Sequence, residues 1–458
     1  MPNTRRGSCA VALGLLLGCV APAHAQIGLS LNRAGSGARA AGMGDAFIAV
    51  SDDGTAASWN PAGLAQLRQP EFSLVYVVSQ HGLSLAGVRS PDDRFAYAVP
   101  AYAYTNGSID FASGAVPFAI RGKPVTLQAG WHRLYQLGVD LTGNIDRVPL
   151  NPSGPATLLS RDSQTRGNID LFSAAGAVKV TSHLALGLSA DFWRGAWTDR
   201  TTLVEASAGD APAFFATSTN VHLRGQSLSG GILLTYPAWN VGLVYHAPFW
   251  SSFHFQGQVL SSVSEPRSVD ATSPRFRLPR SMGAGVARRF GARWMVAAAL
   301  THDQWTDALL DRRPGEPEAV NFFDNAPPDL STARDTLSFN AGVEHLFLRE
   351  GSVVPLRLGI GWEPQGGTDP LTRDPVNFLL LCGGAGYNTN RFKFDAAVQY
   401  RRGSFLVSDV YSVATADAGV GRDAVGRAAT REWRIKVSAI YRLADTDALR
   451  GALRRIFG

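Results

Sequence analysis

The sequence predicts an all-β protein, a closed antiparallel transmembrane β-barrel with an N-terminal plug in its lumen. Three observations predict this fold. The chain begins with an export signal, and its body is a series of long strands in which apolar and polar residues alternate. Between the two lies a short segment rich in Gly and Ala.

Residues 1–25 have the pattern of a cleavable signal peptide, so the mature chain is expected to begin at Gln26. Arg5 and Arg6 precede an apolar run over 11–20, and the small-residue site 23–25 follows. Lipidation of Cys19 is the alternative, because residues 16–19 loosely resemble a lipidation site. Cleavage after residue 25 leaves a single cysteine, which excludes an intramolecular disulfide.

Composition narrows the location of the mature chain. Beyond the signal, no apolar stretch approaches the roughly 20 residues that a spanning helix needs. The net charge of +6 comes almost entirely from arginines, which are spread along the chain. This distribution favours a surface that faces solvent or lipopolysaccharide over a nucleic-acid site. We therefore expect outer-membrane lipid and lipopolysaccharide as partners, and no nucleic acid.

The strands carry the strongest pattern. Residues 391–401 and 431–443 place aromatic and aliphatic side chains on one face and mostly charged or polar side chains on the other, and 183–193 and 353–363 also alternate. Each stretch has about ten residues or more, which is the length of a tilted membrane strand. Tryptophans lie near strand ends, as interfacial aromatic girdles do: Trp193, Trp239, Trp294, Trp305, Trp362 and Trp433.

Connection lengths predict the topology. Short connections alternate with long ones if 239–262 is one long strand, and outer-membrane barrels have short periplasmic turns and long outer loops. The short connections are 180–182, 236–238, 290–291 and 388–390, and the long ones are 136–166, 194–218, 306–334 and 403–430. Both mature termini are then periplasmic, in a bacterial outer membrane. A direct count gives sixteen strands, with 71–104 the most ambiguous region.

Residues 26–70 do not read as barrel strands. Glycines and alanines from Gly35 to Gly44 favour close backbone packing, and residues 52–54 and 60–61 form turns. A nucleotide-binding loop does not fit, because no βαβ unit surrounds these glycines. The segment is therefore expected to be a compact plug, followed by the barrel over 71–443.

Two blocks of this chain resemble the FadL/TodX family of outer-membrane transporters for hydrophobic compounds. The first comprises 37–50, 52–53 and Asn60-Pro61-Ala62, which matches the family's Asn-Pro-Ala motif. The second comprises 278–281, 283–286, 293–294 and 303–305. The resemblance implies fourteen strands and a plug motif of Asn60, Pro61, Ala62, Gly42 and Gly44. Asp45 departs from it, since close relatives often have glycine there.

The resemblance also implies passive, ligand-gated uptake of long-chain fatty acids or similar lipophiles, including aromatic hydrocarbons. Such cargo is expected in a dry apolar pocket inside the barrel, which the apolar side chains at the start of the plug fill until a ligand displaces them. The pocket candidates are Ile27, Leu29, Leu31 and Phe47. The barrel assembly machinery is a further expected partner.

Two other features are candidates for steps of this uptake. Pro100 and Pro117 are expected inside early strands, where proline removes a ladder hydrogen bond, so they are candidates for a lateral gate. A harmless bulge explains them equally well. Candidates for an outer catch are Phe214, Phe215, Trp250 and Phe253, although girdle or loop packing also accounts for aromatic residues there.

Catalytic chemistry is not indicated. The histidines are scattered singly, no Cys-x-x-Cys spacing occurs, and no serine lies in a nucleophile elbow, so no enzyme, metal or cofactor is expected. Two other functions stay open: a PorV-type barrel that binds secreted proteins, and a structural barrel without cargo. The tail 444–458 has a short amphipathic pattern, which fits a membrane-surface helix or a frayed end.

Overall fold

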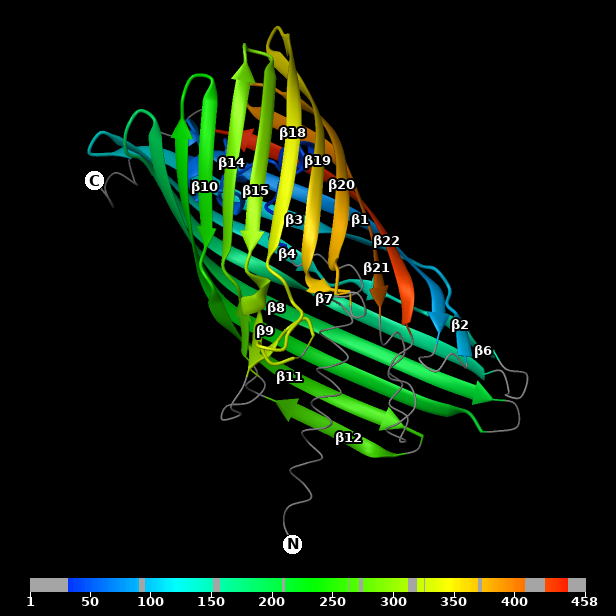
Figure 1. Cartoon of the computed structure of the whole chain (residues 1–458). Coiled ribbons are helices and arrows are strands. Elements are labelled where there is room, and N and C mark those ends of the chain that lie inside the picture. Colours follow the sequence, from blue (N-terminus) through cyan, green and yellow to red (C-terminus); the bar gives the residue numbers. More distant parts are fainter. Residues whose placement is uncertain are drawn as a thin grey trace.

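The structure is a computed structural model that describes residues 32–89, 95–150, 157–207, 211–262, 264–271, 275–311, 319–324, 326–369, 373–407 and 425–443. All its strands belong to one sheet, which closes on itself into a barrel (Figure 1). The signal peptide, the pocket candidates Ile27, Leu29 and Leu31, and the tail 444–458 lie outside the described residues. None of the helices within those ranges has the length and apolar character needed to span a bilayer.

Fourteen strands form the ring, and every neighbouring pair is antiparallel. In ring order they are β1 (Glu71–Arg89), β3 (Tyr102–Ile120), β4 (Lys123–Gln136), β7 (Thr157–Lys179), β8 (Leu184–Ser207), β9 (Ala213–Thr235), β10 (Trp239–His246), β14 (Ser281–Phe290), β15 (Trp294–Asp303), β18 (Thr336–Arg349), β19 (Ser352–Thr368), β20 (Pro375–Asn388), β21 (Phe392–Val407) and β22 (Val425–Arg442). The ring closes through β1 and β22, whose register starts at Glu71↔Arg442. Closure leaves no sheet edge to face lipid.

Eight short strands extend the wall at one end of the barrel. They are β2 (Phe95–Ala98), β5 (Val139–Asp140), β6 (Gly143–Pro149), β11 (Phe249–Ser261), β12 (Ser264–Ala271), β13 (Arg275–Leu278), β16 (Leu309–Asp311) and β17 (Val320–Asn321). We call this the loop end, and we call the opposite end, where tight turns join β14 to β15 and β20 to β21, the short-turn end. In Figure 1 the loop end is at the bottom, where β11 and β12 are labelled.

The predicted fold class is confirmed, and the strand number is the fourteen that the resemblance implied. The direct count of sixteen was too high by one hairpin, because β11 and β12 pair with each other beyond the ring. The expected single strand over 239–262 is also divided. It breaks between β10 and β11 at Ala247-Pro248, where proline has no N–H to donate.

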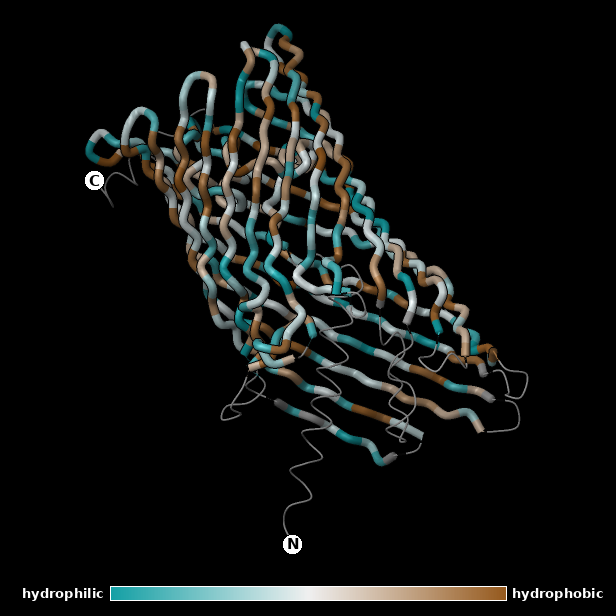
Figure 2. The backbone as a smooth tube through the Cα atoms, viewed as in Figure 1, coloured by the Kyte–Doolittle hydropathy of each residue, from teal (hydrophilic) through white to brown (hydrophobic). Residues whose placement is uncertain are grey.

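The two faces of the strands differ as the alternation predicts. Along β22, Trp433, Ile435 and Val437 point outward and are 46%, 48% and 48% exposed. Lys436, which lies between two of them, and Ser438, which follows the last, are buried. Figure 2 shows hydrophobic residues along the walls of the barrel. Exposed apolar side chains in this number are costly in water and favourable against lipid. The outer surface therefore fits a membrane-spanning barrel.

Residues 32–70 precede β1 and include three short helices, α2 (Ala38–Gly42), η1 (Ala56–Ser58) and η2 (Pro61–Gln66). Helix α2 contacts β19 to β22, and η2 contacts β4, β7, β8 and β9, so the segment bridges opposite walls of the ring. Asn60 caps η2 by accepting a hydrogen bond from the backbone N–H of Ala62 at 3.1 Å. Pro61 follows at the first helical position, where its missing N–H is not needed.

Glycines let the plug backbone touch the wall. Gly44 has φ 64°, and a Cβ on it would lie 2.7 Å from the backbone nitrogen of Ile360. A Cβ on Gly359 of β19 would lie 2.1 Å from the backbone nitrogen of Gly44. Both atoms are backbone, so neither contact is relieved by a rotamer change. The plug and the wall therefore require glycine on both sides of this contact.

We predict that Gly359→Ala displaces the plug while the barrel stays closed. The added methyl group overpacks a backbone contact, which typically costs about 1–3 kcal/mol. The measurement is ion conductance in planar bilayers, where the variant should leak more than the parent protein. Gly230→Ala is the matched control, because nothing lies within 4 Å of a Cβ there. Equal conductance of the parent and Gly359→Ala, with both barrels folded, would contradict the plug contact.

Candidate functional site

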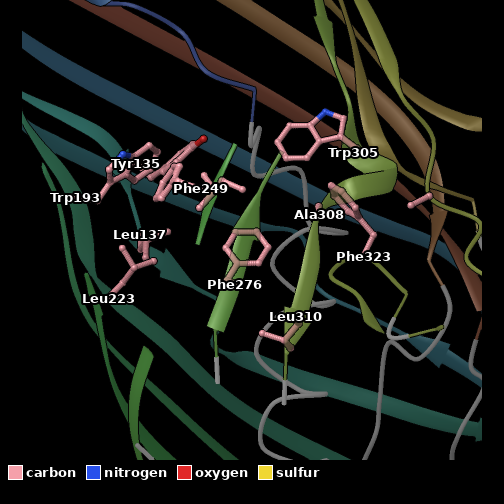
Figure 3. Packing of buried hydrophobic residues seen from close by; sticks show 12 residues of the cluster. Tyr135, Leu137, Trp193, Leu223, Phe249, Phe276, Trp305, Ala308, Leu310 and Phe323 are labelled. Carbon is pink, nitrogen blue, oxygen red and sulfur yellow. The ribbon is translucent and has the colours of Figure 1, made fainter. Parts of the chain in front are cut away.

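An aromatic cluster lies in the lumen toward the loop end (Figure 3). Trp193 of β8 packs against Phe249 of β11 with ring centroids 4.9 Å apart. The cluster, called here the outer aromatic cluster, comprises Tyr135, Leu137, Trp193, Leu223, Phe249, Phe276, Leu278, Trp305, Ala308, Leu310, Phe323 and Ala333. Trp305 belongs to the 3-10 helix η3 (Trp305–Asp307) and meets Phe323 edge to face at 5.5 Å. These buried side chains pack together toward the loop end, where the long strands extend past the plug.

Arg33, at the start of the described plug, lies against this cluster. Its guanidinium carbon is 4.9 Å from the ring centroid of Trp193 and 5.8 Å from that of Phe249. Its Nη2 atom is buried and has no hydrogen-bond partner among the residues that the structure describes. Burial lowers the pKa of the guanidinium, and the fields of Tyr135 and Asp191 oppose this shift. A buried cation with an unused donor is a strong candidate for binding an anionic or polar ligand group.

A cavity of about 250 Å³ lies next to Arg33 inside the ring. Its lining includes Arg33 and Tyr135, which it shares with the outer aromatic cluster. Most of the other lining side chains are polar or charged, among them Asp45, Asp110, Gln128, His132, Asp303, Glu363, Arg401, Glu432, Arg434 and Lys436. The cavity therefore combines polar and apolar groups, and the expectation of a dry apolar pocket for cargo stays a prediction. The outer aromatic cluster adds a larger group of buried apolar side chains toward the loop end.

The β3–β4 ladder breaks beside this cavity. The two strands pair only from Phe111↔His132 to the short-turn end, although both continue toward the loop end. The break coincides with a bulge, because Val75 and Tyr76 of β1 pair with Phe111 and Ile109, so Asp110 has no partner on β1. A bulge bends its strand and redirects a side chain. Here it turns the Asp110 carboxylate inward, where Ser36 Oγ donates to it and Lys436 Nζ lies 3.3 Å away.

Beyond the break, side chains span the opening in place of ladder hydrogen bonds. Asn106 Nδ2 donates to the carbonyl of Gly138 at 2.6 Å, and Ser108 Oγ donates to Gln136 Oε1 at 3.1 Å. Farther out, pairing of β2 with β6 closes the wall again. The cavity lining reaches this opening, since it includes Asn106, Ser108, Gln136 and Gly138. At this opening in the ladder, side chains therefore form the wall between the cavity and the outer face of the barrel.

Buried ion pairs fix the plug to the wall. Arg39 of α2 pairs with Asp52 of the plug and with Glu344 of β18, where Nη2 lies 2.9 Å from Oε1. Arg357 of β19 pairs with Glu344 at 2.7 Å and with Asp395 of β21 at 2.6 Å. We call these five residues the plug-anchoring network. Desolvation by burial lowers the pKa of Arg39, but the combined fields of Asp52 and Glu344 outweigh this effect. The pKa of Arg39 is therefore raised.

Asp45 occupies the position where the family often has glycine, and its backbone explains this preference. Its φ is 65°, a conformation that glycine adopts freely and that aspartate tolerates. Its carboxylate accepts a hydrogen bond from Gln399 Nε2 at 3.2 Å and lines the cavity. Desolvation by burial raises its pKa to about 6, with Glu363 adding to the shift and Lys436 and Arg434 opposing it.

The structure places the predicted site residues in different environments. Among the plug-motif residues, Asn60 donates from Nδ2 to the carbonyls of Ile48 and Ile232, each at 3.1 Å, and so joins the plug to β9. Gly42 lies against Gly384 of β20, where a Cβ on Gly42 would be 3.1 Å from its Cα. Phe47 is fully buried against Trp59 in the plug core, away from the cavity lining.

The catch and gate candidates are also dispersed. Phe253 packs on the outer aromatic cluster, but Trp250 and Phe214 are each 42% exposed, and Phe215 is half-buried beside Leu203 of β8. Pro117 lies inside β3, in register with Thr126 near the short-turn end. Pro100 lies between β2 and β3, so the expectation that it sits inside a strand is wrong. The break in the ladder lies at Asp110 instead of at either proline.

Sequence analysis did not single out Arg33 or Asp110. One signal was present for Asp110, because it is an acidic residue at an inward position of a strand that is otherwise short of charge. Arg33 had none, since it precedes the recognisable glycines and only its contact with Trp193 sets it apart.

Comparison with solved structures gives the fold of the whole chain. A Pseudomonas aeruginosa FadL homologue superposes with a TM-score of 0.61 over 91% of this chain and 99% of its own, at 14% sequence identity. The P. putida toluene transporter TodX gives 0.58 over 90% and 100%, also at 14% identity. The Ralstonia pickettii toluene transporter TbuX gives 0.54 over 90% and 99%, at 14% identity. The chain has the FadL/TodX fold. No protein-family model and no curated protein matches the sequence.

We predict that the plug docks less tightly as the pH rises from about 4 to 6. The pKa of Asp45 is raised to about 6 in the docked plug, from about 3.9 for a free aspartate. The docked state therefore binds the proton more tightly, and this contribution is complete below pH 4 and lost as the pH rises through 6. Leak conductance of the parent protein should increase over this range.

Asp45→Asn is the matched control, since it cannot ionise and retains a side chain of similar size. Its conductance should be flat between pH 4 and 7. The same pH dependence in Asp45→Asn would assign the titration to another group.

Proposed function

We propose that this protein is an outer-membrane channel for the passive uptake of hydrophobic compounds, long-chain fatty acids among them. One observation carries the proposal. One cavity is lined by Tyr135 of the outer aromatic cluster, by Arg33 with its unused Nη2 donor, and by the side chains at the break between β3 and β4. A channel for amphipathic cargo needs this order of surfaces: an apolar catch, a polar recognition group and an exit.

The orientation follows from the connections. In outer-membrane barrels the short turns are periplasmic and the long loops face outward. The outer aromatic cluster then faces the cell exterior, the plug lies toward the periplasm, and both mature termini are periplasmic. Cargo would enter the cluster from outside, displace the apolar first residues of the mature chain, and leave sideways through the opening at Asp110.

The solved structures of the same fold support the transport class. TodX and TbuX are described as toluene transporters, and CymD as a monoaromatic hydrocarbon channel. Arg33 separates the present chain from a channel for neutral hydrocarbons alone. A buried guanidinium beside aromatic rings is best used by a ligand with an apolar body and an anionic head.

We predict that Arg33→Gln weakens fatty-acid binding about tenfold or more and leaves binding of the matched alcohol nearly unchanged. A charge-assisted hydrogen bond to a carboxylate contributes about 1.5–3 kcal/mol, and a neutral hydroxyl gains much less from the guanidinium. The measurement is displacement of a fluorescent long-chain fatty acid from detergent-purified protein by palmitate and by hexadecanol.

Arg68→Gln is the control, because Arg68 is an exposed arginine of the same segment and lies away from the cavity lining. Equal loss for palmitate and hexadecanol would show that Arg33 shapes the pocket without recognising a charge. No binding of either compound by the parent protein, together with capture of a secreted protein, would favour the PorV-type alternative.

We also predict that closing the opening between β3 and β4 blocks uptake while the cargo still binds. Ser108→Cys combined with Gln136→Cys permits a short bis-methanethiosulfonate to bridge the two strands through a disulfide to each cysteine, with sulfinate as the leaving group. The measurement is uptake of labelled fatty acid by cells that carry this variant, before and after the bridge is reduced.

The single variants, treated in the same way, are the controls. Uptake should fall several-fold only in the bridged double variant and recover on reduction. Undiminished uptake through a bridged barrel would place the exit elsewhere and would leave the Arg33 prediction untouched.

A further inference from the structure

Two pairs of outward-facing arginines lie near the outer edge of the lipid-facing surface, in the same arrangement on different walls of the barrel. Arg194 of β8 is directly opposite Arg224 of β9 in the register. Arg402 of β21 is directly opposite Arg431 of β22. All four side chains are exposed. Like charges directly opposite on neighbouring strands destabilise a sheet, so each pair calls for a compensating anion.

Among the described residues, no acid adjoins the second pair in the register. At the Arg402–Arg431 pair, the register neighbours on the adjoining strands are Leu379 and Gly82, which are uncharged. The adjacent Glu432 points into the lumen, where it pairs with Arg434 at 2.5 Å.

The first pair has one acid beside it, which does not balance its charge. Asp170 of β7 is directly opposite Arg194 in the register, and its carboxylate also pairs with Arg133 at 3.0 Å and accepts from Asn168 at 2.7 Å. This single carboxylate therefore lies beside three arginines, Arg133, Arg194 and Arg224. Arg194 donates only to the carbonyl of Trp193, at 3.5 Å.

The position of the pairs along the barrel identifies the level of the membrane. Tyr400 and Trp433 lie one side-chain repeat closer to the short-turn end than Arg402 and Arg431, face outward, and have ring centroids 4.6 Å apart. On the other wall, Phe192 precedes Arg194 by the same repeat and is 43% exposed. Aromatic side chains of a barrel lie at the interface between hydrocarbon and headgroups. Two further residues along a strand add roughly 7 Å, which brings the arginines to the depth of the headgroups.

We propose that each arginine pair is a binding site for a phosphate group of an outer-leaflet lipid, with the phosphorylated glucosamine lipid, lipid A, as the occupant. Two guanidinium groups on neighbouring strands offer parallel N–H donors to the oxygens of one phosphate, and arginine suits this bidentate contact better than lysine. A lipid fits better than a free phosphate ion, since its acyl chains lie along the exposed apolar residues below each pair. This inference does not depend on the transport function.

The test compares the full-length mature protein with a fourfold variant, Arg194→Gln, Arg224→Gln, Arg402→Gln and Arg431→Gln. Both are stripped of lipid in detergent and titrated with diphosphorylated lipid A, with dephosphorylated lipid A, and with inorganic phosphate. We expect the parent protein to bind the diphosphorylated lipid at least tenfold more tightly than the variant does. It should bind the dephosphorylated lipid no better than the variant.

Arg288→Gln is the control, because Arg288 is an exposed arginine at the short-turn end, 4.7 Å from the ring centroids of Trp239 and Phe290. It should bind lipid A as the parent does. The fourfold variant must also melt no lower than the parent in lipid-free detergent, since it loses like-charge repulsion.

Three outcomes would overturn the proposal. Equal lipid A affinity of the parent and the fourfold variant would remove the arginines as the binding groups. Binding of inorganic phosphate as tightly as lipid A would remove the lipid as the occupant. A fourfold variant that melts lower would show that the arginines stabilise the wall without an anion, which also contradicts the argument.

Discussion

The contact between the Arg39 guanidinium and the Glu344 carboxylate is the interaction on which the interior of this barrel depends. It joins the plug to β18, and Arg357 extends it to β19 and β21. Two charges taken out of water are favourable only when each has partners with good geometry. Here Glu344 accepts from both arginines, and Asp52 and Asp395 take the remaining charge.

This network anchors only part of the plug. It holds α2 and the residues after it, whereas Arg33 lies upstream of the anchored part and contacts Trp193 of the outer aromatic cluster. In the mechanism that we propose, a ligand would therefore compete for Arg33 and for apolar contacts without breaking the ion pairs.

The fold could be predicted from the sequence because lipid enforces a simple rule. In β22, alternation of Trp433, Ile435 and Val437 with Arg434 and Lys436 has one solution in a membrane, a closed barrel with the charges inside. The extra hairpin and Pro100 were misplaced because β2, β11 and β12 lie beyond the membrane. There the same alternation indicates only that one face of a strand is in contact with solvent. It does not show whether that strand belongs to the ring.

The site could not be predicted to the same degree, because its key features are relations between distant residues. Asp110 is the one extra residue of β3 in the register of β1 against β3, and this extra residue interrupts the ladder. The register of two strands cannot be read from the pattern of a single sequence. The unused donor of Arg33 is visible only once Trp193 and Phe249 surround it. The Asn-Pro-Ala motif was found because its chemistry is local: a capping amide, a proline at the first helical position and a small residue at the wall.

The mixed lining of the cavity has a physical reason in the plug beside it. A lumen lined only with apolar groups would give the plug no directional contacts, whereas charged groups such as Asp45, Glu363 and Lys436 can fix one docked arrangement. The apolar groups of the same cavity adjoin the outer aromatic cluster through Tyr135. In the function that we propose, an amphipathic cargo would therefore contact aromatic side chains with its apolar body and charged groups with its head.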